Sequence, residues 1–403
     1  MIKGRDIIVV GIQPWDIEIG SNCKNIALEF SKNNRVLYVN PPTDRITVLK
    51  EKNNPKVQKR IQISKSKLPE LEIIENNLWN LYPKTIIESI NWIGSEWLYD
   101  TLNRRNAKLF VNDIKRAINK LGFKDYLLFN DSSMFLGVYL KELLEPKLYT
   151  YYVRDNLVKE PYWKRHGERT EPLVIEQADL VVNNSEYYVD YSSKFNKNST
   201  MVGQGCDTSI FVDVDDSIEV AEEFNNIKSP IIGYVGSLTT YRLDISLIEF
   251  IAVQKPDWSI VLVGPEDENF KKSNLHNLSN VHFFGNKPME RLPNYIKGFD
   301  VTINPQVVNE ITIGNYPRKI DEYLAMGKPV VATYTKAMEM FKDYVYLGET
   351  KEDYIQLIEK ALENITSKKI EKIAFAKSHS WENNVKAIYK EMQLSLKNLE
   401  LCN

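Results

Sequence analysis

Short apolar runs alternate along the chain with longer segments in which apolar residues recur at helical spacing. The runs predict two sets of buried strands. The first set covers residues 7–10, 36–39, 126–129, 148–153 and 180–182, and the second covers 231–235, 259–263, 281–284, 301–303 and 330–332. Strands that alternate with helices are typical of parallel sheets covered by helices on both faces. The sequence therefore predicts an α/β protein with two doubly wound, Rossmann-like domains.

The acidic segment 213–230 separates the two sets, and its few apolar residues follow no regular spacing. It predicts a linker between an N-terminal domain over 1–212 and a C-terminal domain over 231–380. Helical spacing predicts a last helix within 381–403 that can pack back on the N-terminal domain. Doubly wound sheets bind ligands outside the carboxyl ends of their strands, so we expect the two domains to face one another across a cleft.

The distribution of charge narrows the classes of partner. The net charge is −2, but basic residues exceed acidic ones by about five in 1–205 and fall short by about seven in 206–403. We expect the basic segment 50–67 to be an exposed loop. A nearby segment mixes aromatic and basic residues, a combination that suits the interface of an anionic membrane: Trp92, Trp97, Tyr99, Arg104, Arg105 and Lys108. A solvated face with the aromatic residues in the core is the plainer interpretation. Nothing resembles a base-reading module, so we expect no nucleic acid partner.

No apolar run approaches the roughly 20 residues that a membrane-spanning helix needs. We therefore expect a cytoplasmic protein that can bind the inner face of the cell membrane peripherally. Cys23, Cys206 and Cys402 are too few and too far apart for a disulfide framework. Without a CxxC pair, and with the Asp-x-Asp of "DVDD" (213–216) lying in the predicted linker, we expect no metal site.

The stretch "NYPRKIDEYLAMGKPVVAT" (315–333) collects charges at the start of a predicted helix. Pro317 suits the first turn of that helix. A helix start offers free N–H groups and a positive dipole end, so Arg318 and Lys319 there suit a phosphate. Glu322, one turn further in, can accept hydrogen bonds from sugar hydroxyls. Together these groups suit a nucleotide sugar, but a surface ion pair worth under about 1 kcal/mol is an equal alternative.

This stretch resembles the donor-site helix and strand of GT-B-type glycosyltransferases, whose pattern is Glu, four mostly apolar positions and then Gly-x-Pro-Val-Val. Further similar segments follow in family order, and the resemblance covers nearly the whole chain. They are "IEQADLVVNNSEYY" (175–188), "MVGQGCDTSIF" (201–211), "IIGYVGSLTTYRLDISLI" (231–248), "VHFFGNKPMERLPNYIKGFDVTINP" (281–305) and "SHSWENN" (378–384). The chain is most similar to bacterial teichuronic-acid and exopolysaccharide glycosyltransferases of families 1 and 4.

The resemblance implies a nucleoside-diphosphate sugar as co-substrate, with UDP favoured over GDP, and neither a metal nor a prosthetic group. Glu322 would bind the ribose and Phe284 the base. Relatives often carry an arginine where this chain has Ser237, so Arg318 or Lys319 would replace that cation. The implied donor-binding residues are Gly20, Gly236, Ser237, Arg242, Phe284, Tyr316, Pro317, Arg318, Lys319 and Glu322.

Other contacts follow from the resemblance and from position. Many retaining relatives carry a glutamate for the donor hexose where this chain has Gly314, so the anomeric outcome stays open. The implied contacts to sugar and acceptor are Asp16, Glu18, Asn309, Glu310 and Thr312. Asp131 and Asp155 each follow a predicted strand and could act as the catalytic base of an inverting reaction. Capping of the following helix is an equally good interpretation of either carboxylate.

We therefore expect a hexosyltransferase that uses a nucleotide sugar and a glycan or lipid-linked acceptor in cell-surface polysaccharide synthesis. Two alternatives remain open. A nucleotide-sugar epimerase of the same fold would need no acceptor pocket. A non-catalytic nucleotide-sugar-binding scaffold would be consistent with the glycine at position 314. A nicotinamide dehydrogenase is disfavoured because no G-x-G-x-x-G follows a predicted strand.

Overall fold

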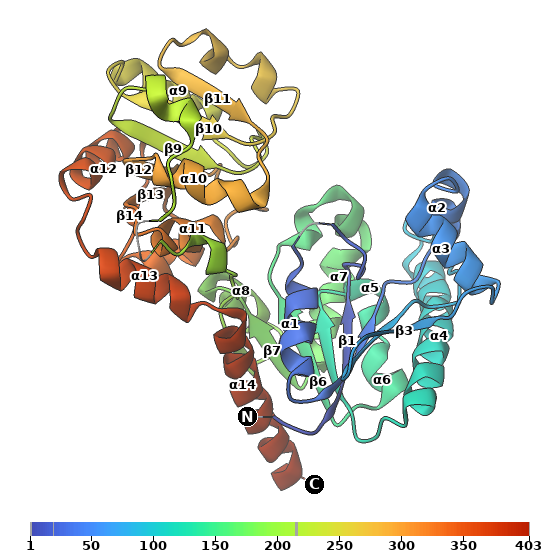
Figure 1. Ribbon diagram of the computed structural model, residues 1–403. Helices are drawn as coiled ribbons and strands as arrows, with labels where there is room; N and C mark the ends of the chain where they lie inside the picture. Colours follow the sequence, from blue (N-terminus) through green and yellow to red (C-terminus); the bar gives the residue numbers. More distant parts are fainter. Residues whose placement is uncertain (1, 19, 214–216, 403) are drawn as a thin grey trace. The chain divides into compact units, whose positions relative to one another are not determined.

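The computed structural model describes residues 2–18, 20–213 and 217–402. The chain forms two compact units. Unit 1 comprises Met1–Gly205 with Trp381–Asn403, and unit 2 comprises Cys206–Ser380. Each unit is a largely parallel sheet with helices on both faces (Figure 1), which confirms the predicted fold class of two Rossmann-like domains. The segment 213–230, predicted to be a linker, lies within unit 2, where Phe224 packs against Phe299.

Unit 1 contains an eight-stranded sheet in the order β3-β4-β2-β1-β5-β6-β7-β8, parallel except for the antiparallel pair β3 and β4. Its strands are β1 (Asp6–Gly11), β2 (Arg35–Val39), β3 (Leu71–Glu75), β4 (Leu78–Leu81), β5 (Leu127–Asp131), β6 (Leu148–Val153), β7 (Leu180–Asn183) and β8 (Ser199–Met201). Its helices are α1 (Asn22–Ser31), α2 (Arg45–Lys50), α3 (Pro55–Ser64), α4 (Glu96–Leu121), α5 (Met134–Gly137), α6 (Leu140–Leu144), η1 (Leu157–Lys159), α7 (Pro161–Gln177), α8 (Glu186–Ser192) and α14 (Trp381–Cys402).

Alternation along the buried strands of unit 1 builds two apolar layers, one on each face of the sheet. Val9 belongs to a cluster with Phe30 of α1 and Ile388 of α14. Its neighbour Val10 belongs to the opposite cluster with Phe110 of α4. Successive side chains of a strand point to opposite faces, so an uninterrupted apolar run is what a sheet covered on both faces requires.

Unit 2 contains a six-stranded parallel sheet in the order β11-β10-β9-β12-β13-β14. Its strands are β9 (Ile231–Val235), β10 (Ser259–Val263), β11 (Val281–Gly285), β12 (Val301–Asn304), β13 (Val330–Thr333) and β14 (Tyr346–Gly348). Its helices are η2 (Ser209–Phe211), η3 (Glu222–Asn226), α9 (Ile245–Gln254), η4 (Phe270–Lys272), η5 (Asn274–Asn277), η6 (Met289–Arg291), α10 (Leu292–Lys297), α11 (Lys319–Ala325), η7 (Lys336–Phe341), α12 (Lys351–Glu363) and α13 (Lys369–Ser378).

The prediction of an exposed loop over 50–67 is wrong, because most of this segment lies in helices α2 and α3. Asp44 caps α2 by accepting the N–H of Thr47. Asn54 caps α3 in the same way, with Pro55 in the first turn. The prediction rested on the basic residues and overlooked two N-cap residues, Asp44 and Asn54, that favour helix starts.

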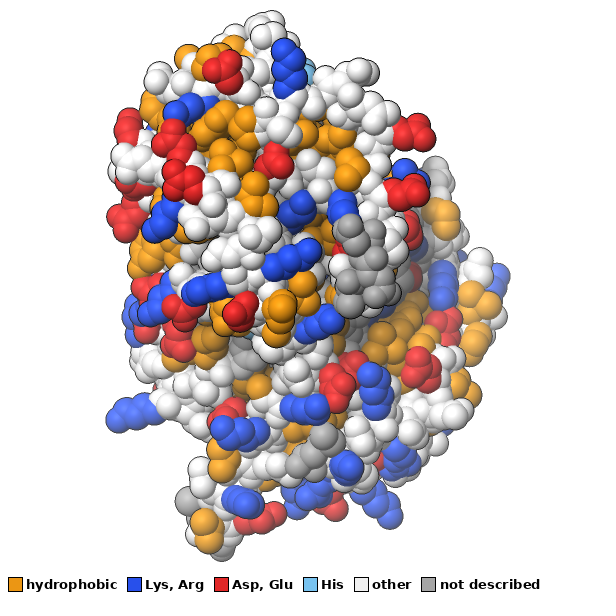
Figure 2. Space-filling view, turned by 60° about the vertical axis from the view of Figure 1, so that its left-hand side comes forward, with side chains coloured by type: hydrophobic (Ala, Val, Ile, Leu, Met, Phe, Trp, Pro, Cys, Tyr) orange, Lys and Arg blue, Asp and Glu red, His pale blue; other side chains and the backbone are white. Residues whose placement is uncertain are grey.

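Charged and hydrophobic side chains are interspersed on the face drawn in Figure 2. None of the helices described here is both long enough and apolar enough to cross a membrane. The strand order reverses at β1 in unit 1 and at β9 in unit 2, and the carboxyl ends of these strands are where doubly wound sheets bind ligands.

Candidate functional site

The loop that follows β9 in unit 2 depends on two glycines. Gly236 and Gly264 have φ angles of +144° and +153°, in a region that favours glycine. A Cβ atom built on Gly264 would lie 1.8 Å from the carbonyl oxygen of Gly236. The two backbones therefore touch, and side chains are excluded where the chain turns at the reversal point.

The segment that follows β12 is tied to this loop by backbone hydrogen bonds. The N–H of Asp244 donates to Pro305 O at 2.9 Å, and the N–H of Val307 donates to Arg242 O at the same distance. Arg242 and the start of segment 305–318 are therefore held at one edge of the unit 2 sheet.

Lys319, the first residue of α11, lies beside the β9 loop. Its Nζ donates a hydrogen bond to the hydroxyl of Tyr234 and lies 4.2 Å from the centre of that ring. A Cβ atom on Gly236 would lie 2.9 Å from Lys319 Nζ. The buried Tyr234 ring, which a cation favours electrostatically, thus holds the ammonium group against the glycine turn.

The charge around this turn is left without internal compensation. Among the residues that the structure describes, no carboxylate pairs with Arg242, Arg318 or Lys319, and nothing donates a hydrogen bond to the carboxylate of Glu322. Burial raises the pKa of Glu322, although Arg318 and Lys319 act to lower it. Arg318 and Lys319 act on one half-buried acid, Glu322, and leave this corner with net positive charge, suited to an anion that also offers hydroxyl donors.

Helix α11 is anchored from behind by a buried acid. The carboxylate of Asp321 accepts a hydrogen bond from the hydroxyl of Tyr316 at 2.6 Å and lies 2.7 Å from Nδ1 of His379. Burial raises the pKa of Asp321, and the bond to His379 opposes that rise. Tyr316 was predicted to contact the donor. Its hydroxyl takes part in this buried network, one turn from Lys319.

The turn after β12 uses its own polar groups. Oδ1 of Asn309 accepts the N–H groups of Ile311 and Thr312 at 2.9 and 3.0 Å. The Thr312 hydroxyl donates to Val307 O and is buried. Two of the predicted sugar contacts, Asn309 and Thr312, therefore shape the loop, whereas Glu310 is exposed at its tip.

The remaining predicted donor residues of unit 2 lie along the same edge. Ser237 is exposed, and its carbonyl accepts from the Tyr234 hydroxyl at 3.4 Å. Pro317 precedes Arg318, the N-cap residue of α11. Phe284, the penultimate residue of β11, is half-buried and packs against Phe224 with ring centres 5.2 Å apart.

In unit 1 the two predicted catalytic acids share one arginine. Asp131 is fully buried at the end of β5, and its two oxygens accept from Nε and Nη2 of Arg154 at 2.8 and 3.3 Å. Asp155 is 41% exposed and pairs with Nη1 of the same guanidinium. The sequence analysis did not identify Arg154, although an arginine between a strand and an aspartate was a visible signal.

The predicted acceptor contacts after β1 are also paired. Asp16 accepts two hydrogen bonds from Arg60 at 2.8 and 3.0 Å. Burial raises the pKa of Asp16, but the bonds from Arg60 outweigh it and the pKa is lowered overall. Glu18 lies 2.9 Å from Lys56 Nζ. Gly20 is exposed, next to the Ser21 side chain that caps α1.

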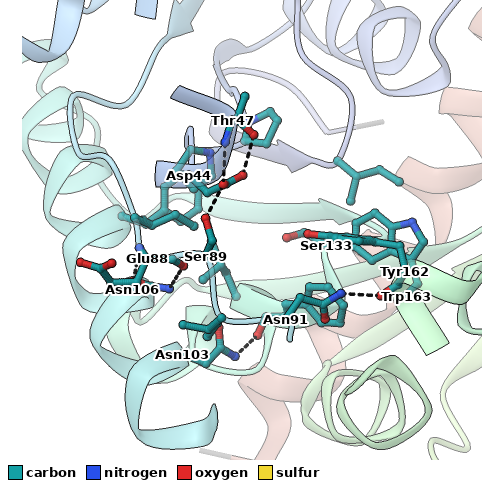
Figure 3. A pocket seen from close by; sticks show the side chains of 18 of the residues that line it. Asp44, Thr47, Glu88, Ser89, Asn91, Asn103, Asn106, Ser133, Tyr162 and Trp163 are labelled. Atoms are coloured by element: carbon teal, nitrogen blue, oxygen red, sulfur yellow. Dashed lines mark hydrogen bonds between the residues drawn. The ribbon is translucent and has the colours of Figure 1, made fainter. Parts of the chain in front are cut away.

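Unit 1 also contains a cavity of about 760 Å³ that sequence analysis did not predict (Figure 3). It lies at the carboxyl end of β1, between α2, α4, α5 and the start of α7. The signal that could have revealed it was the density of aromatic residues in two segments that follow strands, 92–99 and 161–163.

Within the described ranges, no three His, Cys, Asp or Glu side chains are grouped closely enough to hold a metal ion. Of the Asp-x-Asp segment, Asp213 pairs with Lys297. Residues 214–216 lie outside the described residues.

Residues 229–364, which include the β9 loop and α11, match the family described as Glycosyl transferases group 1. A curated protein of Bacillus subtilis (strain 168), named as a candidate teichuronic acid biosynthesis glycosyltransferase, TuaH, is 29% identical over 226 residues. These residues are 52% of this chain and 54% of that protein, so the chain spans about half the length of this relative.

Solved structures share the fold over almost the whole chain. A sucrose-phosphate synthase from Thermosynechococcus elongatus has a TM-score of 0.64 at 16% identity, covering 99% of this chain and 100% of its own. Anabaena Alr3699/HepE, in complex with UDP, has a TM-score of 0.66 at 13% identity, covering 96% and 99%. An α,α-trehalose 6-phosphate synthase from Burkholderia multivorans has a TM-score of 0.68 at 8% identity, covering 100% and 98%. At these identities the likeness shows the fold alone.

Proposed function

We propose that this chain, a GT-B-type glycosyltransferase by its family match and its fold, moves a hexose-type sugar from a nucleoside-diphosphate sugar to a glycan or lipid-linked acceptor in cell-surface polysaccharide synthesis. The observation that carries the proposal is the uncompensated ammonium of Lys319, which Tyr234 holds against the turn at Gly236. A diphosphate is the group that such a corner suits, because it brings two negative charges to a glycine-lined backbone.

Each group of the corner has a role in this proposal. Lys319, Arg242 and Arg318 bind the diphosphate and stabilise the charge that builds on it as the bond to the sugar breaks. Glu322 accepts hydrogen bonds from the ribose hydroxyls. UDP is the favoured nucleotide because Anabaena Alr3699/HepE has been solved with UDP and with UDP-glucose. The turn with Asn309, Glu310 and Thr312 faces the sugar.

Asp155 is the better candidate for the catalytic base. A base must reach the acceptor hydroxyl, and Asp155 is exposed whereas Asp131 is enclosed with Arg154. Asp131 would then act as a positioning residue that holds Arg154, and through it Asp155. In this proposal Asp16 and Glu18 contact the acceptor beside the first helix, and unit 1 binds an anionic membrane peripherally.

A thermal-shift titration tests the donor site. UDP should raise the melting temperature of the wild type, because a ligand that binds only the native state stabilises it. Lys319→Ala should lose most of that shift. Lys360→Ala is the matched control, since Lys360 lies over Tyr346 at 5.7 Å as Lys319 lies over Tyr234. An equal shift in Lys319→Ala and Lys360→Ala would refute the assignment of the phosphate site.

Two further arms separate transfer from the alternatives. UDP should still shift the melting temperature in EDTA, because the cations of the chain take the place of a metal in this proposal. Release of UDP from UDP-glucose should depend on an added acceptor. Interconversion of nucleotide sugars without acceptor would instead support an epimerase, and binding without any turnover would support a scaffold.

A further inference from the structure

The cavity of unit 1 has walls that suit hydrocarbon better than sugar. Its volume of about 760 Å³ falls within the range of ligand-binding pockets. Aromatic rings form one side, where Phe135 stacks on Trp163 at 5.0 Å and Tyr162 meets Trp163 edge-on at 5.2 Å. Val10, Ile87 and Leu136 are among the aliphatic residues that complete the wall.

The polar side chains at this cavity are largely satisfied by the protein itself, as the dashed lines of Figure 3 show. Asp44 accepts from the hydroxyls of Ser89 and Thr47. Asn106 exchanges two hydrogen bonds of 3.0 Å with the backbone of Glu88. Asn103 donates to Phe135 O at 2.8 Å. Asn91 donates to Tyr162 O, and its buried Oδ1 has no partner among the described residues. Such single acceptors are too few for the many hydroxyls of a saccharide, most of which would be buried without partners.

Large apolar side chains are exposed around the same cavity. Trp92 and Tyr162 line it and are 69% and 59% exposed, and Ile46, also in the lining, is 42% exposed. Trp97, at the start of α4, lies outside the lining and is 77% exposed. Exposed apolar groups gathered at a cavity mark an interaction surface, and tryptophan and tyrosine favour the interface of a lipid bilayer.

One cation lies at the cavity. Arg165 lines it, and its Nη1 donates to Trp92 O at 2.8 Å. The described part of the chain places no carboxylate against this guanidinium. Lys164 precedes it, exposed and likewise without an acidic partner among those residues. The lining also contains two carboxylates, but Glu88 pairs with Arg45 and Asp44 accepts hydrogen bonds from Thr47 and Ser89. The unpaired charge of Arg165 is complementary to an anionic head group on a hydrocarbon chain.

We propose that this cavity binds the hydrocarbon chain of a lipid phosphate, whose phosphate meets Arg165 while Trp92 and Trp97 lie in the bilayer interface. The inference rests on the proposed function only in naming this lipid as the acceptor's carrier. Binding of the lipid can be measured without any sugar transfer. A lipid-linked acceptor would thus be recognised by its chain as well as by its sugar.

Calorimetry with alkyl phosphates of increasing length tests the cavity directly in the full chain. Each added methylene between hexyl and decyl phosphate should tighten binding about fourfold, as burial of one methylene predicts. Maltose should show no measurable binding. Affinity that does not change with chain length, or maltose binding as tight as that of decyl phosphate, would overturn the proposal.

Ser133→Trp fills the cavity, and the Ser133 side chain makes no capping hydrogen bond that would be lost. This variant should bind decyl phosphate at least tenfold more weakly than the wild type. Ser193→Trp, at an exposed position that ends α8, is the matched control and should bind as the wild type does. Unchanged binding by Ser133→Trp would contradict the proposal. The shift in melting temperature caused by UDP reports on unit 2. If UDP caused no shift in the wild type, that result would count against the proposed function and not against lipid binding in unit 1.

Arg165→Gln gives a second test at an exposed position, should Ser133→Trp fold poorly. This variant should bind octyl phosphate about tenfold more weakly and should bind 1-octanol as tightly as the wild type does. An equal effect on both ligands would contradict the contact between Arg165 and the phosphate. On vesicles of phosphatidylglycerol and phosphatidylcholine, Trp97→Ser should reduce co-sedimentation severalfold. Ile370→Ser is the control, because Ile370 is 80% exposed in unit 2. Equal loss in both variants would contradict bilayer contact through unit 1.

Discussion

Charged side chains are paired differently in two regions of the molecule: the corner of unit 2 around the turn at Gly236, and the carboxyl ends of the strands of unit 1. In the described residues of unit 2, Arg242, Arg318 and Lys319 have no acidic partner. In unit 1, every acid that the sequence suggested for chemistry already has a cation. Asp16 pairs with Arg60, Glu18 with Lys56, and Asp131 and Asp155 with Arg154.

The difference indicates which unit is prepared for an anion. A paired carboxylate already has its stabilising partner, so a ligand must compete for it. An unpaired ammonium beside bare backbone gains that stabilisation only when an anion binds. Unit 1 instead offers an apolar cavity, whose ligand gains by leaving water. The two units therefore offer binding sites of different chemistry, as the proposed transfer between two different substrates requires.

Removing Arg154 should give the largest change in stability. Arg154→Leu leaves Asp131 as an uncompensated charge that is fully buried. We expect unit 1 to lose about 3–5 kcal/mol in free energy of unfolding, measured by urea denaturation.

The double variant Asp131→Leu with Arg154→Leu is the control. It should recover most of the loss, because an apolar pair of similar volume removes the buried charge. If Arg154→Leu cost less than about 1 kcal/mol in free energy of unfolding, the pairing of Asp131 with Arg154 would not be important for the stability of unit 1, and the contrast with unit 2 would fail.

Glu171 should give unit 1 a pH dependence. Burial raises its pKa to about 7, although the hydroxyls of Tyr151 and Tyr191 each donate to it at 3.0 Å and act to lower it. The folded state then keeps a proton that the unfolded state loses near pH 4.5. Stability should therefore fall as the pH rises from about 5 to 8, by roughly 1–3 kcal/mol.

Glu171→Gln should remove this fall when melting is followed across the same pH range. Glu168→Gln, an exposed position on the same helix, should keep the wild-type profile. A wild-type stability that rises between pH 5 and 8 relative to Glu171→Gln would reverse the sign and refute the assignment.

Removing one hydroxyl sharpens the account of unit 2. Tyr234→Phe keeps the ring beneath Lys319 but loses the hydrogen bond that aims Nζ at Gly236. We expect UDP to bind about 3- to 10-fold more weakly by calorimetry, since a hydrogen bond contributes about 0.5–1.5 kcal/mol. Tyr346→Phe, beneath Lys360, should leave UDP affinity unchanged. Equal affinities in all three proteins would show that the hydroxyl does not position Lys319.

Asp16→Asn should have the smallest effect on stability. The pair with Arg60 is bidentate but less buried than that of Arg154, with side-chain exposures of 12% and 22%, so its loss should cost about 1–2 kcal/mol. If Asp16 also contacts the acceptor, the variant should raise the KM for acceptor and leave UDP binding intact. A loss of stability above about 2 kcal/mol would instead make this pair as structural as that of Arg154.

The fold could be predicted where burial on both faces imposed long apolar runs. All ten predicted strands are present. Nine of them lie in the interior of a sheet, and the tenth, β11, is an edge strand that still carries the apolar residues Val281, Phe283 and Phe284. The strands that were missed are β3, β4, β8 and β14. β3 is largely exposed or half-buried and carries Glu72 and Glu75, and β8 and β14 have three residues each. β4 has four residues and lies between β3 and β2, whereas the other three are edge strands. Short or polar strands leave no apolar run to recognise.

The site could be predicted only as far as local signals reached. Pro317, Lys319 and Glu322 stand at the start of a helix that the structure confirms as α11. The partner that aims Lys319 could not be found, because Tyr234 lies 85 residues earlier and nothing local links the two. The pairing of Asp131 with Arg154 could not be predicted for the same reason, because it depends on β5 and β6 being neighbours in the sheet.

The central claim is that Lys319, held by Tyr234, binds the diphosphate of a nucleotide beside Gly236. A crystal structure of the chain with UDP tests it most directly. The account predicts Lys319 Nζ within hydrogen-bond distance of a phosphate oxygen, and the Glu322 carboxylate on the ribose hydroxyls. UDP bound elsewhere would contradict the claim, and so would UDP bound here with Lys319 Nζ beyond hydrogen-bond distance of its phosphates.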